Sequence, residues 1–119
     1  MEVAVAATPA PPGSELKLEI ETTLDRIVVR CSGRITATSV ELLLTSVRPL
    51  ILQTKQIALD LADLSYLDSS GLGALVQLWA AAKQAGTELT VVNLNKRIQD
   101  LLSLSNLASI FEGRQKSGL

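Results

Sequence analysis

The segment Ile57 to Leu61 constrains the fold more than any other part of this chain. It is short and almost wholly apolar, with Asp60 as its only interruption. Such a run is typical of a central strand that is covered on both faces of a sheet. Because aromatic residues make up only 3% of the chain, the core must be built from Leu, Ile, Val and Ala, the usual filling of a sheet covered by helices.

Two further strands are predicted before this central one. From Leu16 to Glu21 apolar and charged residues alternate strictly, as in a strand with one buried face. The run Ile27 to Ser32 is rich in β-branched residues and ends at Gly33, so it is expected to pair with the first strand as a hairpin. A strand at Leu89 to Val92 follows later in the chain.

Between the strands, apolar residues recur at helical spacing. Thr38 and Glu41 form a capping-box pattern at the start of the first helix, and Pro49 is expected to end or kink it. Gly86 is well placed to stop the second helix, and Asn95 can cap a third. The predicted stripes are Val40, Leu43, Leu44 and Val47, then Leu72, Leu75, Val76 and Trp79, then Ile98, Leu101 and Leu102.

The resulting order of elements predicts one α/β domain. Each strand-helix-strand passage implies parallel neighbours, so we expect a mixed β-sheet with helices packed against it. The 119 residues are enough for a single domain. We expect a flexible N-terminal tail at residues 1–14, the folded domain at 15–112, and a frayed C-terminal tail at 113–119. The segment Leu107 to Phe111 is apolar but does not indicate an element type.

Charge and composition argue against several classes of partner. The formal net charge is -1 and the sequence has no long basic run, so it does not predict a positively charged surface that would bind nucleic acid directly or an anionic membrane. No stretch reaches the roughly 20 apolar residues that span a bilayer, and the start lacks the basic region of a secretory signal. We therefore expect a cytoplasmic protein without membrane insertion. Cys31, the only cysteine, is expected to be a small buried hydrophobe.

The most unusual local chemistry lies at Asp68 to Gly73, between a buried strand and a helix. In open α/β sheets partners gather at the carboxyl ends of strands, where helix starts present unpaired N–H groups. One interpretation is that Asp68, Ser69 or Ser70 only caps the helix while the glycines permit a tight turn. A second is a phosphate-binding loop, although the glycine pattern is incomplete and no GK[ST] follows.

A catalytic or metal role has less support. The chain has no histidine, so no Ser-His-Asp triad can form around Ser69 or Ser70, and only a serine-lysine pair stays formally possible. With one cysteine and no histidine, metal ligands would have to be carboxylates, and Asp60, Asp63 and Asp68 lack the spacing of a metal loop. We expect no enzyme activity, no catalytic residues and no cofactor or metal.

The run from Ala58 to Gly73 resembles the STAS family, and specifically its anti-sigma factor antagonists. Downstream, Gly86 to Asn93 resembles the next strand of the family, and Ile98 through Phe111 its closing helices. The resemblance implies a phosphorylation site at Ser69, directly after the aspartate. It implies a surrounding partner-binding surface formed by Asp68, Ser69, Ser70, Gly71, Leu72 and Gly73.

The same resemblance implies a function. The unphosphorylated form would bind an anti-sigma factor that is also a serine kinase, phosphorylation of Ser69 would switch binding off, and a serine phosphatase would reverse it. Two departures concern partner identity: Thr36 stands where relatives often carry an acid, and Asn106 replaces a common glycine. The alternative is a STAS interaction module of another pathway, such as a stress-signalling scaffold, a lipid-transport accessory or a transporter-associated domain.

Overall fold

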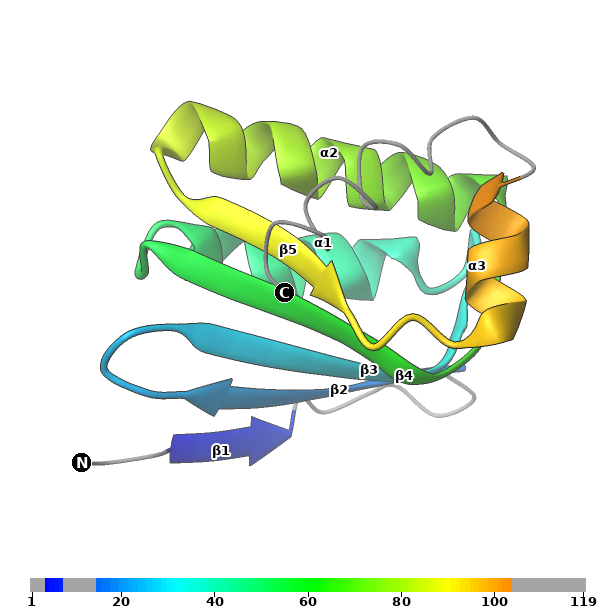
Figure 1. Ribbon diagram of the computed structural model, residues 1–119, viewed down its shortest axis with the longest axis horizontal. Coiled ribbons are helices and arrows are strands. Elements are labelled where there is room, and N and C mark those ends of the chain that lie inside the picture. The colour runs from blue at the N-terminus through cyan, green and yellow to red at the C-terminus, as the bar shows by residue number, and fades with distance from the viewer. Residues whose placement is uncertain (1–3, 8–14, 104–119) are drawn as a thin grey trace.

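The computed structural model describes residues 4–7 and 15–103, and Figure 1 shows their arrangement. A five-stranded sheet carries its strands in chain order, β1-β2-β3-β4-β5. Pairing is antiparallel from β1 to β3 and parallel from β3 to β5, so the predicted mixed sheet is confirmed. The elements are β1 (Ala4–Ala7), β2 (Leu16–Thr22), β3 (Ile27–Ile35), α1 (Val40–Ile51), β4 (Gln56–Leu67), α2 (Ser69–Ala85), β5 (Glu88–Val92) and α3 (Lys96–Ser103).

Helices α1 and α2 pack against each other and lie on the same face of the sheet (Figure 1). This follows from the strand order, because two successive crossovers of the same hand that step in the same direction place both helices on one side. The core between these layers is aliphatic, and Leu43, Leu59 and Leu75 are fully buried in it. Helix α3 instead contacts β4.

Strand β4 confirms the prediction of a buried interior strand, because three consecutive residues, Ile57, Ala58 and Leu59, are buried and β4 has parallel neighbours on both sides. The strand is longer than the predicted run Ile57 to Leu61, since it continues to Leu67. Register shifts against β3 interrupt the alternation of buried and exposed residues there, which hides the strand from a sequence pattern.

Strand β3 also runs further than predicted. It does not end at Gly33 but passes through it to Ile35. Gly33 adopts a φ of +99°, and a Cβ atom there would overlap the carbonyl oxygen of Glu15. The amide of Arg34 donates to that same oxygen at 3.0 Å. Gly33 thus permits a bulge that brings Glu15 against the end of β3.

The prediction of a flexible tail at residues 1–14 is wrong for Ala4–Ala7, which form β1. This strand pairs with β2 in an antiparallel register that sets Ala4 opposite Thr22 and Ala7 opposite Glu19. The ladder satisfies backbone groups that an edge strand would otherwise leave unpaired. The other parts of the predicted N-terminal tail lie outside the described residues. So do Asn106, the segment Leu107 to Phe111 and the predicted C-terminal tail at 113–119.

At the helix ends, some predicted signals hold. Gly86 ends α2 in the left-handed conformation with φ +75°, and the Asn95 side chain accepts from the amide of Ile98 at 3.0 Å. The capping box at Thr38 is wrong, because Ser39 occupies the N-cap of α1 without a side-chain capping bond. Pro49 lies inside α1, which ends soon after it, at Ile51.

The prediction for Cys31 is confirmed, since its side chain is buried in the core. Burial, with a smaller contribution from the charge of Asp60, raises the pKa of the thiol to about 12. The residue is therefore a neutral hydrophobe at physiological pH.

Candidate functional site

The predicted site lies where β4 ends and α2 begins. Asp68 is the N-cap of α2 in an extended conformation, and its Oδ1 accepts from the Gly71 amide at 3.0 Å. Its own amide donates to the carbonyl of Ile35 at the end of β3, at 3.2 Å. The capping interpretation is thus confirmed for Asp68, which fixes the entrance of the helix to the neighbouring strand.

Ser69 and Ser70 are both exposed in the first turn of α2. Neither hydroxyl makes a hydrogen bond to the rest of the described chain. The first amides of a helix have no partner within it and carry partial positive charge, which favours an anionic group at this position. Both hydroxyls are therefore accessible for modification and for contact with a protein.

The two glycines of the segment have different surroundings. Gly71 is buried, and a Cβ atom there would lie 2.8 Å from the Ile35 carbonyl oxygen and 2.5 Å from Leu67 Cδ1. A Cβ at Gly73 would meet nothing within 4 Å. Leu72 is half-buried and packs against the core. The six predicted residues are contiguous, but Gly71 faces the fold while Ser69 and Ser70 face outward.

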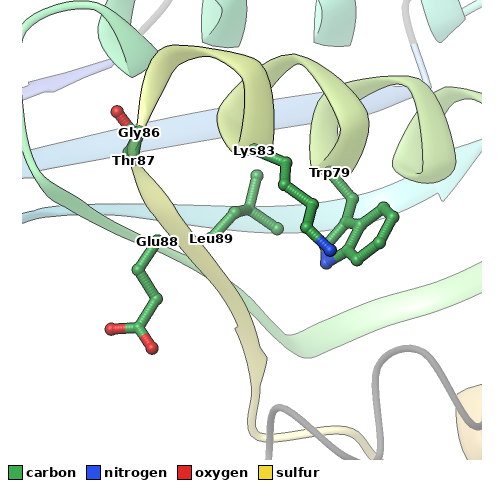
Figure 2. Close-up of a pocket in the computed structure, with 6 residues that line it drawn as sticks. All are labelled: Trp79, Lys83, Gly86, Thr87, Glu88 and Leu89. Atoms are coloured by element: carbon green, nitrogen blue, oxygen red, sulfur yellow. The ribbon is translucent and has the colours of Figure 1, made fainter.

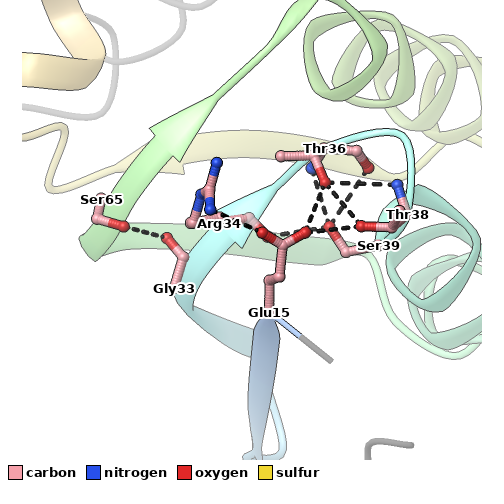
Figure 3. Close-up of polar contacts among 7 residues, drawn as sticks. All are labelled: Glu15, Gly33, Arg34, Thr36, Thr38, Ser39 and Ser65. Carbon is pink, nitrogen blue, oxygen red and sulfur yellow. Dashed lines mark hydrogen bonds and ion pairs between the residues drawn. The ribbon is translucent and has the colours of Figure 1, made fainter. Parts of the chain in front are cut away.

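Beside this segment lies a polar cluster that sequence reasoning missed (Figure 3). The Glu15 Oε2 atom accepts from the Thr38 hydroxyl at 2.7 Å and from the Thr36 hydroxyl at 3.0 Å, while Oε1 pairs with Arg34 Nη1 at 2.9 Å. Thr36 directly follows Ile35, the residue that touches the start of α2. Where the resemblance anticipates an acid at position 36, the structure places the carboxylate of Glu15 against the Thr36 hydroxyl.

The cluster stabilises the charged form of Glu15. The Thr38 hydroxyl and then the Thr36 hydroxyl lower the pKa of Glu15, desolvation opposes them, and the Arg34 charge adds a smaller lowering effect. On its other side the Arg34 guanidinium lies 5.4 Å from the centre of the Tyr66 ring. No local motif links Glu15 to Thr36, and the antiparallel pairing of β2 with β3, which sets Leu16 opposite Gly33, brings them together.

A pocket of about 220 Å³ lies at the opposite end of α2. Figure 2 shows Lys83 next to Trp79 there, with the ammonium 4.8 Å from the ring centre. The Trp79 indole N–H finds no acceptor among the described residues. Since α2 has 17 residues and rises about 1.5 Å per residue, this pocket is separated from Ser69 by most of the helix. Its lining is Trp79, Lys83, Gly86, Thr87, Glu88 and Leu89.

The described residues hold neither a metal-binding cluster nor a membrane-spanning helix. No group of three or more His, Cys, Asp or Glu side chains in residues 4–7 and 15–103 is placed to hold a metal ion. Within the same ranges, no helix has both the length and the apolar character needed to cross a membrane.

Known proteins resemble this chain in sequence. It is 29% identical over 102 residues to the anti-sigma-B factor antagonist of Bacillus subtilis (strain 168), covering 86% of this chain and 94% of that protein. It is 30% identical over 97 residues to the anti-sigma F factor antagonist of Paenibacillus polymyxa, covering 80% and 83%.

Solved structures show the same fold. An anti-sigma factor antagonist from Mycobacterium paratuberculosis superimposes with a TM-score of 0.70 at 23% identity, over 87% of each chain. The unphosphorylated form of the antagonist SpoIIAA gives a TM-score of 0.66 at 21% identity, covering 76% of this chain and 82% of that one. The family model described as the STAS domain matches residues 17–118. The chain therefore belongs to the STAS domain family.

Proposed function

We propose that this protein is an anti-sigma factor antagonist whose partner binding is switched by phosphorylation of Ser69. The unphosphorylated form binds an anti-sigma factor that is also a serine kinase, and so releases a sigma factor. A serine phosphatase restores the active form. The protein acts in the cytoplasm as a binding protein and catalyses no reaction itself.

The observation that carries this proposal is the hydroxyl of Ser69 at the first position of α2, directly after the capping residue Asp68; this hydroxyl is exposed and bonds to no other described residue. A kinase can reach this hydroxyl without disturbing the core. The names of the relatives support the partner class, because both curated relatives described above are called anti-sigma factor antagonists. A related solved structure is that of SpoIIAA in a phosphorylated form, with a TM-score of 0.61.

The switch works through charge at a contact surface. The partner-binding surface comprises Asp68, Ser69, Ser70, Leu72 and Gly73, with the buried Gly71 supporting it from the side of the fold, and protein contact would exclude water from it. A phosphoserine adds about -1.5 to -2 charges and considerable bulk at this position. Burying an unpaired charge in an interface costs several kcal/mol, and about 1.4 kcal/mol already lowers affinity tenfold. The modified surface therefore no longer binds the kinase.

Affinity capture tests the partner class. Unmodified protein immobilised on a resin is expected to retain a kinase-like anti-sigma factor from the native cytoplasm, identified by mass spectrometry. Incubating the captured kinase with ATP and the antagonist is expected to place one phosphate on Ser69, located by peptide mapping. Phosphate on Ser70 or on neither serine would contradict the assignment, and recovery of only membrane-transport components would favour a STAS module of another pathway.

Two substitutions test the switch itself. Ser69→Asp is expected to weaken binding of the captured anti-sigma factor by at least about tenfold, because it introduces charge at the contact, while Ser69→Ala is expected to bind like the unmodified protein. Isothermal calorimetry measures both affinities. Gln84→Glu, which adds one negative charge at an exposed position near the other end of α2, serves as the control and is expected to bind like the unmodified protein. Equal affinities of the Ser69→Asp and Ser69→Ala proteins would exclude an electrostatic switch at this residue.

A further inference from the structure

We propose that Arg34, held over Tyr66 beside the Ser69 surface, is a second anchor for the anti-sigma factor and binds a carboxylate side chain on it. The inference rests on the proposed function and specifies the chemistry that the partner must present. It adds to the predicted surface a pair of residues from the adjacent strands β3 and β4.

Arg34 and Tyr66 form an exposed pair suited to protein recognition. The two residues are direct partners in the β3–β4 register, and the guanidinium lies 5.4 Å from the centre of the tyrosine ring. The Arg34 side chain is 53% exposed and Tyr66 is 37% exposed. Tyrosine and arginine are enriched among the few residues that dominate binding at protein interfaces.

The guanidinium is already oriented before a partner arrives. Its Nη1 atom pairs with Glu15 Oε1 at 2.9 Å, and Glu15 is itself fixed through Oε2 by the hydroxyls of Thr36 and Thr38 (Figure 3). Arginine presents five N–H donors in a rigid fork, so donors beyond those facing Glu15 stay available to a ligand. A planar carboxylate matches that fork with two parallel hydrogen bonds. Fixing the arginine in advance reduces the loss of freedom on binding.

The pair lies close enough to Ser69 to share one interface with it. Tyr66 and Ser69 are separated by three residue steps, and a fully extended chain spans about 3.6 Å per step, so their Cα atoms lie within roughly 11 Å. A standard interface covers about 800 Å² of each partner, a patch roughly 30 Å across. An anti-sigma factor seated on Ser69 is therefore large enough to reach Tyr66 and Arg34 as well.

Arginine substitutions at the two ends of β3 test the proposal. The anti-sigma factor recovered by capture is titrated with purified full-length variants in a calorimeter. Arg34→Ala is expected to weaken binding by about tenfold or more, the range of a truncated interface anchor. The matched control is Arg26→Ala, which removes the same charge from an exposed position before the start of β3. It is expected to change affinity by less than about twofold, since surface charges outside a contact contribute little.

A conservative variant separates the fork from the charge. Arg34→Lys keeps the positive charge but loses the bidentate geometry, so it is expected to bind more weakly than the natural protein but better than Arg34→Ala. Raising the salt concentration is expected to weaken binding of the natural protein more than that of the Arg34→Ala protein. Urea unfolding of each variant is expected to show that the fold is retained, because an exposed ion pair such as Arg34–Glu15 contributes little to stability.

The outcomes distinguish this inference from the function on which it rests. If the natural protein binds the anti-sigma factor, Ser69→Asp blocks binding, and Arg34→Ala binds like Arg26→Ala, the anchor is refuted and the proposed function stands. If the natural protein binds no anti-sigma factor, both fail. If the Arg34→Lys protein and the natural protein bind the anti-sigma factor with equal affinity, the two-bond recognition of a carboxylate by the guanidinium is refuted. Only the positive charge of residue 34 would then contribute to binding.

Discussion

At the scale of single residues, Gly71 and Gly73 look alike in the sequence but have different physical roles. The backbone of Gly71 lies so close to Ile35 and Leu67 that even one added carbon would be crowded. Gly73 sits one turn into the helix with open space in the direction of a Cβ atom. Packing of the fold therefore requires a glycine at position 71, whereas a larger residue at position 73 is compatible with a stable fold.

We expect Gly71→Ala to destabilise the protein and Gly73→Ala to stabilise it. At position 71 the new methyl group meets a backbone carbonyl that cannot move independently, a form of overpacking that costs about 1 to 3 kcal/mol. At position 73 alanine is the better helix former by up to about 1 kcal/mol. Urea unfolding midpoints measure both effects, with each variant serving as the control for the other. If both substitutions shift the urea midpoint in the same direction, the close contact at Gly71 does not determine the stability of the Gly71→Ala protein.

At the scale of elements, Asn95 joins α3 to β4. Its amide nitrogen donates to the carbonyls of Leu61 and Leu64, at 3.2 and 2.8 Å, while its Oδ1 accepts from the amide of Ile98. One side chain thus caps the helix and satisfies carbonyls along the irregular second half of the strand. These carbonyls would lose a partner if the amide were removed.

Asn95→Asp is expected to lower the free energy of unfolding by about 1 to 3 kcal/mol, although aspartate is as good a cap as asparagine. The reason is that a carboxylate keeps the cap but has no N–H groups for the β4 carbonyls. Urea unfolding gives the free energy, and amide exchange locates the loss at α3. Asn93→Gly is the control, since Asn93 has a φ of +57° that glycine adopts readily and its bond to Asp60 is exposed. If the Asn95→Asp protein is as stable as the natural one, the bonds from Asn95 to the β4 carbonyls add no stability and its contribution is only that of a helix cap.

The elements also show what the sequence can and cannot predict. Signals that depend on one residue and its neighbours were read correctly, as for Gly86 at the end of α2 and Asn95 before α3. The second half of β4 and the pairing of β1 were missed, because they depend on a bulge and on an edge that exist only in the assembled sheet. Likewise the place of Asp68 to Gly73 between a buried strand and a helix was predicted from the local pattern, and Ser69 within it from the resemblance, while the cluster at Glu15 joins positions far apart in the chain.

At the scale of the whole molecule, we expect phosphorylation of Ser69 to leave the fold intact. A phosphate at a helix start gains about 0.3 to 1 kcal/mol from the unpaired amides and the dipole. Repulsion from Asp68 opposes this, but water and salt screen it at an exposed position to about the same size. The two effects nearly cancel against a total stability of roughly 5 to 15 kcal/mol.

Urea unfolding of the two forms is expected to differ by less than about 1 kcal/mol, with amide chemical-shift changes confined near Asp68 to Leu75. The Ser69→Ala protein, treated with the same kinase, controls for modification at other positions. Widespread shifts through β4 and β5 would show a global conformational change and would refute a switch that acts only at the surface.

The order of the strands has a consequence for how the protein is made. Since the described sheet runs β1-β2-β3-β4-β5, each strand pairs with the one synthesised just before it. A strand that leaves the ribosome therefore finds its neighbour already present, and the sheet can grow in the direction of translation without waiting for a distant part of the chain. The growing edge is always the newest strand, so each of β2, β3 and β4 is an open edge only until the next strand pairs with it, and β1 and β5 stay as the two edges of the described sheet.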